Sequence, residues 1–109
     1  MSQYVFIESR DPFTSGEAGF VAEVATALRR RGNEVTVFLV QNGVLAARKT
    51  ARNTRLGGLA EAGVRLLADD FSLCERGIQA DEIGAGIEPS TIDLLVELLA
   101  RHDTKAIWH

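Results

Sequence analysis

Cys74 is the only thiol in the chain and the residue best suited to covalent chemistry. A thiolate is a strong nucleophile, and it forms most readily at the N-terminus of a helix or beside cations. Cys74 instead lies in an acidic stretch with Asp69, Asp70 and Glu75, and Arg76 is the neighbouring cation. Because carboxylates disfavour a thiolate, the local sequence favours an inert, small apolar side chain over a reactive thiol.

Other kinds of chemical site are not indicated. A single cysteine excludes an intramolecular disulfide. His102 and His109 have no ligand cluster at the usual spacing, so no metal site is predicted. The chain also lacks the glycine pattern of a dinucleotide site and the P-loop motif, so no cofactor is predicted. Glu8 and Asp11 match the acidic cluster of a receiver domain poorly, which makes a nucleotide-binding or receiver-like function the weakest alternative.

Length and composition indicate one domain. The chain has 109 residues, of which 46% are apolar, and a formal net charge of −3 at pH 7. We therefore predict a single domain over residues 1–109 with no strong nucleic-acid signal. The first residues carry no basic leader and no apolar stretch could span a bilayer, so we expect a cytoplasmic protein without membrane contact.

Several apolar runs predict the strands that must position any site. Residues 4–7 are a continuous apolar run, residues 64–68 are apolar except for Arg65, and residues 34–40 are rich in β-branched side chains. Such runs are typical of strands buried on both faces, so these three should be central and parallel. A short fourth strand is predicted within 82–87 and a final one at 105–108.

Helical segments separate these strands. Thr14 and Glu17 form a capping box at the first helix, and the last helix is predicted to begin at Pro89 and Ser90. This alternation predicts a three-layer α/β/α fold with a mostly parallel sheet of about five strands. Ligands in such sheets bind beyond the carboxyl ends of the strands. The segments at those ends are 8–13, 41–43 and 69–71.

Four short motifs lie in the predicted loops: Pro12-Phe13, Asn42-Gly43-Val44, Arg76-Gly77-Ile78 and Gly86-Ile87. In this order and spacing the chain resembles, over nearly its whole length, the DsrE/DsrF-like sulfur-relay family, which includes the TusD-type subunits. The resemblance implies a five-stranded parallel sheet, a homo-oligomer (trimer or hexamer), a sulfur-carrier partner and a cysteine that carries sulfur as a persulfide. The binding residues that it implies are Pro12, Phe13, Asn42, Gly43, Arg76 and Gly77.

The cysteine of this family stands at the end of the third strand, eight positions before the glycine of the Arg-Gly-Ile triplet. That position is Asp69, and a second family cysteine position is Ser72. Asp69 is either a helix N-cap or a polar group at the mouth of the family's pocket. Cys74 is either buried, which the spacing of Phe71, Cys74 and Ile78 favours, or a relocated sulfur carrier.

A basic segment holds Arg48, Lys49, Arg52 and Arg55 without apolar periodicity. It is predicted to be a solvated loop. The alternative is a cationic surface for an anion or an acidic partner.

Two functions remain open from the sequence. The first is sulfur trafficking by persulfide transfer, on Cys74 or on a partner's thiol. The second is a non-catalytic member of the same fold that acts as an oligomeric scaffold or a small-ligand-binding subunit. Whether the chain is an enzyme depends on Cys74, because a carrier thiol must be accessible.

Overall fold

The computed structural model describes residues 2–11, 19–51 and 55–109. Its centre is a five-stranded sheet with the strand order β4-β3-β2-β1-β5, and every pair of neighbouring strands is parallel. The strands are β1 (Gln3–Glu8), β2 (Glu34–Leu39), β3 (Arg65–Asp69), β4 (Ile87–Ser90) and β5 (Thr104–Trp108).

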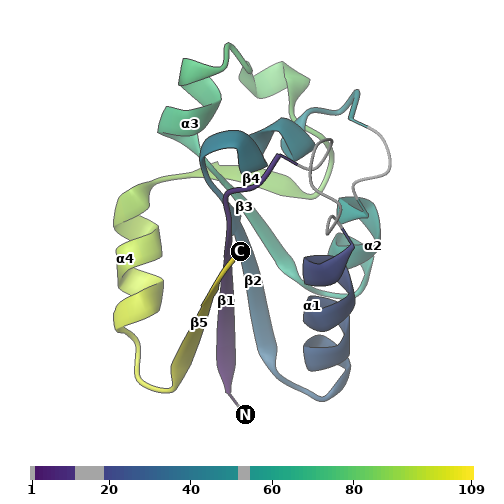
Figure 1. Ribbon diagram of the computed structural model, residues 1–109, viewed down its shortest axis with the longest axis vertical. Coiled ribbons are helices and arrows are strands. Elements are labelled where there is room, and N and C mark those ends of the chain that lie inside the picture. Colours follow the sequence, from purple (N-terminus) through teal and green to yellow (C-terminus); the bar gives the residue numbers. More distant parts are fainter. Residues whose placement is uncertain (1, 12–18, 52–54) are drawn as a thin grey trace.

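Helices lie on both sides of this sheet. Figure 1 shows α1 and α2 on one side and α4 on the other, with α3 beyond the carboxyl ends of the strands. This arrangement confirms the predicted α/β fold with a parallel sheet between helices. The helices are α1 (Phe20–Arg30), α2 (Leu56–Glu61), α3 (Asp70–Glu75) and α4 (Ile92–Ala100), and two 3₁₀-helices are η1 (Gln41–Ala47) and η2 (Ala80–Glu82).

The three predicted central strands, β1, β2 and β3, do occupy the middle of the sheet. Their side chains alternate between two cores, as the two-residue period of a strand requires. In β2, Val37 and Leu39 point into the first core, and Phe38 points into the second. All three are buried, which explains why residues 37–40 are all apolar.

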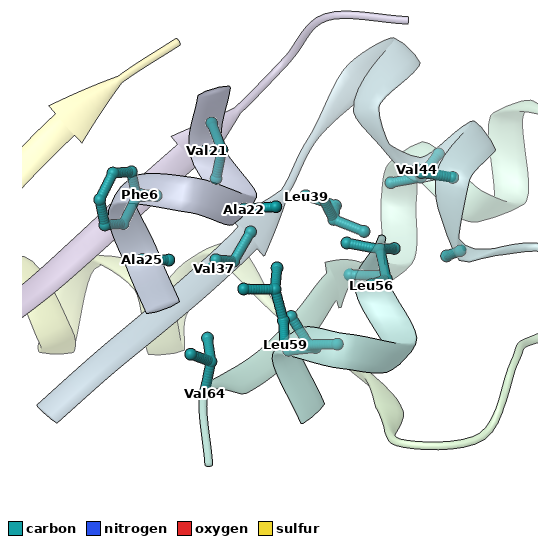
Figure 2. Packing of buried hydrophobic residues seen from close by; sticks show 14 of the residues in the cluster. Phe6, Val21, Ala22, Ala25, Val37, Leu39, Val44, Leu56, Leu59 and Val64 are labelled. Carbon is teal, nitrogen blue, oxygen red and sulfur yellow. The ribbon is translucent and has the colours of Figure 1, made fainter. Parts of the chain in front are cut away.

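The first and larger core lies between the sheet, α1, α2 and η1. Figure 2 shows that this core extends from Phe6 of β1 and Ala25 of α1, past Val37 and Leu59 of α2, to Val44 of η1 at its other end. The buried apolar residues of α1, namely Val21, Ala22 and Ala25, face this core. The second core is smaller: Leu95 and Leu98 of α4 pack on Val5, Ile7, Phe38, Val40 and Leu67.

Two sequence predictions near the last helix are wrong. The fourth strand is Ile87–Ser90 rather than a segment within 82–87, so Pro89 and Ser90 belong to a strand. Proline is tolerated there because β4 is an edge strand, where a missing N–H costs no ladder bond. The helix begins at Ile92 instead, and the Thr91 side chain caps it by accepting from the Leu94 N–H at 3.3 Å. The capping box of Thr14 and Glu17 lies outside the described residues.

Candidate functional site

Asp69 is the last residue of β3 and the N-cap of α3. Its side chain is 3% exposed, and Oδ2 accepts from the Ser72 N–H at 3.1 Å and from the Ser72 hydroxyl at 2.7 Å. Oδ1 is buried and has no hydrogen-bond partner among the described residues. The N-cap interpretation is therefore confirmed: a buried carboxylate caps the N-terminus of α3.

Ser72 connects this cap to the neighbouring strand. Its hydroxyl is buried, donates to Asp69 and accepts from the Gln41 N–H at 2.9 Å. Gln41 is the first residue of η1 and has a left-handed φ of 50°, so the chain turns away from the direction of β2 at this residue. The ends of β2 and β3 are thus fixed to each other through one serine hydroxyl.

Arg76 forms a second connection between the same two strand ends. Its Nε and Nη2 both donate to Asn42 Oδ1, at 3.2 and 3.0 Å, and its Nη1 donates to the Ser72 carbonyl at 3.3 Å. The structure therefore brings together two residues predicted to bind, Asn42 and Arg76. In the described structure they bind each other.

Gly77 ends α3 with a Schellman motif. Its φ of +67° is left-handed, the Gly77 N–H donates to the Cys74 carbonyl at 3.1 Å, and the Ile78 N–H donates to the Leu73 carbonyl at 2.9 Å. Ile78 is then buried in the first core. The Arg-Gly-Ile triplet has a physical role at each position: the link to Asn42, the left-handed turn and the apolar anchor.

Gly43 packs against the end of β1. A Cβ added to it would overlap the Glu8 carbonyl oxygen and would lie 3.0 Å from the Glu8 carbonyl carbon. The same Glu8 carbonyl accepts from the Val40 N–H at 3.0 Å, so it has little freedom to move. Only glycine allows this close approach.

Cys74 is exposed, so the prediction that it faces the core is wrong. The inner side of α3 is formed by Ser72 and Leu73, and Phe71 is 65% exposed. The polar Ser72 can take an inner position because its hydroxyl donates to Asp69 and accepts from the Gln41 N–H. A prediction based on the spacing of apolar residues does not detect these hydrogen bonds. Cys74 lines an open cleft of about 420 Å³ with Asp70, Leu73, Gly77, Ile78, Gln79, Ala80, Ile83 and Pro89.

The remaining predicted site residues divide into two groups. Pro12 and Phe13 lie outside the described residues. The others lie around the carboxyl ends of β2 and β3, where they fix the positions of the backbone segments that follow these strands: Asn42, Gly43, Asp69, Arg76 and Gly77.

A contact at the ends of β1 and β5 was not predicted. His109 Nδ1 lies 2.8 Å from Glu8 Oε2, and the two side chains are only 9% and 16% exposed. The His109 ring also stacks on Phe20, with 5.2 Å between ring centroids. The residues of this pair are 101 positions apart, so only the sheet order brings them together.

The basic segment is partly paired. Arg55 lies 3.4 Å from Glu23 in an exposed ion pair, and Arg48 Nε donates to the Leu45 carbonyl at 3.0 Å. Arg52 is not among the described residues. Within the described ranges, no group of three or more metal-ligating side chains comes together, and no helix there is long and apolar enough to cross a membrane.

Replacing Asp69 with alanine is expected to lower the free energy of unfolding by about 2 kcal/mol, because α3 loses its cap and the buried Ser72 hydroxyl loses its acceptor. Asp70→Ala is the matched control: Asp70 is exposed in the first turn of α3, and its loss should change stability by less than about 0.5 kcal/mol. Urea unfolding of both variants measures the difference. Equal losses would contradict the capping role of Asp69.

Comparisons with known proteins agree with this fold. The model of the DsrE/DsrF-like family matches residues 2–105. Among solved structures, the chain is similar to the ychN protein from E. coli, with a TM-score of 0.89 and 20% identity. It is also similar to MTH1491 from Methanobacterium thermoautotrophicum, a protein of unknown function, with a TM-score of 0.75 and 19% identity. Both matches cover 100% of each chain. No curated protein matches.

Proposed function

Because the chain belongs to the DsrE/DsrF-like family, we propose that it takes part in sulfur relay in the cytoplasm and receives sulfur as a persulfide on Cys74. The observation that carries this proposal is the exposure of Cys74 in a cleft beside the ends of the strands. Asp69 occupies the place that the family resemblance assigns to the carrier cysteine. Cys74 is five positions away and is the only thiol that can replace it.

The transfer that we propose needs no oxidant or cofactor. The Cys74 thiolate attacks the outer sulfur of a persulfide on a sulfur-carrier protein. The donor's sulfur–sulfur bond breaks, a new one forms on Cys74, and the donor leaves as a thiolate. The proton released when Cys74 ionises balances the proton that the leaving thiolate takes up, so atoms and electrons are conserved.

The cleft supports such a step. Its walls include the apolar side chains of Leu73, Ile78, Ile83 and Pro89, which a docked partner protein could cover. Because the cleft is open to solvent on one side, the persulfide-bearing residue of a carrier protein can approach the thiol. We further propose that the chain works as a homo-oligomer, a trimer or a hexamer.

A second candidate is a non-catalytic member of the fold, acting as a scaffold or a small-ligand-binding subunit. One observation favours it: Asp69 is buried and bonded as a cap, so a strand-end sulfur carrier is replaced by a structural carboxylate.

Sulfur loading separates the two candidates. Folded wild-type protein exposed to a persulfidated donor protein should gain the mass of one sulfur atom, and Cys74→Ala should gain none. The matched control is Ala27→Cys in the Cys74→Ala background, since Ala27 is exposed on α1, away from the cleft. Intact-mass measurement over time should show wild type loading several-fold faster than this control.

If the wild-type protein loads no faster than the Ala27→Cys control, Cys74 has no role beyond that of any surface thiol. The carrier proposal is then wrong, and the non-catalytic candidate remains.

A further inference from the structure

The cleft beside Cys74 is mostly apolar and is open on one side. Figure 1 shows that α3, which forms one wall, stands beyond the carboxyl ends of the strands, apart from the helices that cover the two faces of the sheet. The volume of the cleft, about 420 Å³, is within the range of sites that bind ligands or side chains. An apolar surface of this kind is typical of a site that a partner covers.

Phe71 extends this apolar surface past the thiol. Residues three positions apart on an α-helix are neighbours on its surface, so Phe71 and Cys74 lie side by side on α3. The Phe71 side chain is 65% exposed. Cys74 therefore lies between an apolar cleft and an exposed aromatic ring, and aromatic rings are enriched where proteins bind one another.

The charge around the cleft is negative. Asp70 is the one charged residue among the described residues that line it. Asp70 precedes Cys74 by four positions, so their Cβ atoms are about 5–6 Å apart on the helix surface. Residues 69–83, which form most of the cleft, hold five carboxylates and one guanidinium, so this segment is more negative than the whole chain at −3. The guanidinium is that of Arg76, which is bonded to Asn42 and to the Ser72 carbonyl.

On the premise that Cys74 carries sulfur, we infer that the cleft and Phe71 dock a basic and apolar segment of the donor protein. This segment has an apolar side chain and a lysine or arginine beside its persulfide-bearing cysteine. The apolar side chain enters the cleft and contacts Phe71, and the cation faces Asp70. We call Asp70, Phe71, Cys74 and the apolar walls of the cleft the donor surface.

The donor's cation has a second role during the transfer. When the sulfur–sulfur bond of the donor breaks, its cysteine leaves as a thiolate, and this negative charge develops near Asp70, which repels it. A cation beside the donor cysteine offsets the repulsion and stabilises the departing thiolate. A donor cysteine flanked by carboxylates is repelled both on docking and during transfer. The donor surface therefore selects its partner by charge.

Persulfidated peptides test this selection without the natural donor. One peptide has leucine next to its cysteine and a lysine on each side of this pair, and the other has glutamates in place of the lysines. Each loading rate, measured by intact mass, is divided by the rate of 2-mercaptoethanol with the same peptide, which removes the peptide's own reactivity. Wild-type protein should prefer the lysine peptide roughly tenfold at low salt, and the preference should largely vanish at about 0.5 M salt.

Three variants locate the preference on the donor surface. Asp70→Asn should lower it several-fold, because the lysines lose their partner charge. Phe71→Ala should slow loading from both peptides to the same extent, because it removes an apolar contact that both share. Asp103→Asn is the matched control: Asp103 is an exposed carboxylate just before β5, at the opposite end of the sheet, and its substitution should leave the preference unchanged.

Equal normalised rates for the two peptides, or a preference that Asp70→Asn does not lower, would overturn the donor surface and leave Cys74 as a carrier. Peptides with serine in place of cysteine transfer no sulfur and test docking alone. Fluorescence anisotropy should show the lysine version binding roughly tenfold more tightly than the glutamate version, and Phe71→Ala should weaken that binding; equal affinities would overturn the inference. Selective docking without any sulfur loading would contradict the proposed function but not the docking.

Discussion

Gly43→Ala is expected to lower the free energy of unfolding by about 3 kcal/mol or more, a large fraction of the stability of a domain this size. The added Cβ would overlap the Glu8 carbonyl oxygen, and both partners of this clash are backbone. Glu8 ends β1, a central strand, and its carbonyl already accepts from Val40. No flexible side chain is available to move aside, so the end of β1 or η1 must shift.

The same substitution elsewhere in the chain provides the control. Gly58 lies inside α2, and a Cβ there would meet nothing within 4 Å. Gly58→Ala should therefore stabilise the protein by about 0.5–1 kcal/mol, since alanine loses less backbone entropy in a helix. Urea unfolding midpoints should move in opposite directions for the two variants. A Gly43→Ala protein as stable as wild type would show that η1 does not pack on β1 as described.

Phe38→Ala is expected to cost about 3–5 kcal/mol, because a fully buried ring is removed and a cavity remains. Phe38 is 0% exposed in β2, the middle strand of the sheet, and it faces the smaller core beneath α4. With few other side chains on that side, the remaining core can close the cavity only by moving α4. The variant should also lose cooperativity in its unfolding transition as α4 loosens.

Phe71→Ala is the control for that experiment. Phe71 is 65% exposed on α3, so the same ring is removed from a site that contributes little burial. Its stability should remain within about 0.5 kcal/mol of wild type. Thermal melts followed by circular dichroism should separate the two phenylalanine variants clearly, and equal losses would contradict the assigned second core.

The central strands could be predicted from sequence because most of their residues are buried on both faces of the sheet, which makes each strand largely apolar. β4 could not be placed correctly for the opposite reason. It is an edge strand whose residues are at most half-buried, and it contains Glu88 and Pro89, so its sequence resembles a loop.

The candidate site was predicted only in part. Position after a strand was enough to place Asp69 and Asn42 near one another, whereas Arg76 was a candidate only through the family resemblance. The side of α3 that carries Cys74 was assigned wrongly, because Ser72 is buried through hydrogen bonds that hydrophobic spacing does not encode. The contact of Glu8 with His109 depends on the order of strands in the sheet, which no local pattern reveals.

The placement of β5 beside β1 has a consequence for how the chain is synthesised. β1 is made first, yet one of its two edges pairs with the last strand, so this edge stays open until about a hundred further residues have left the ribosome. Closing so long a loop late is entropically costly and slow relative to local pairing. An apolar strand with an open edge is the kind of segment to which other chains can pair. The nascent chain is therefore most vulnerable to aggregation in the interval before residues 104–108 emerge.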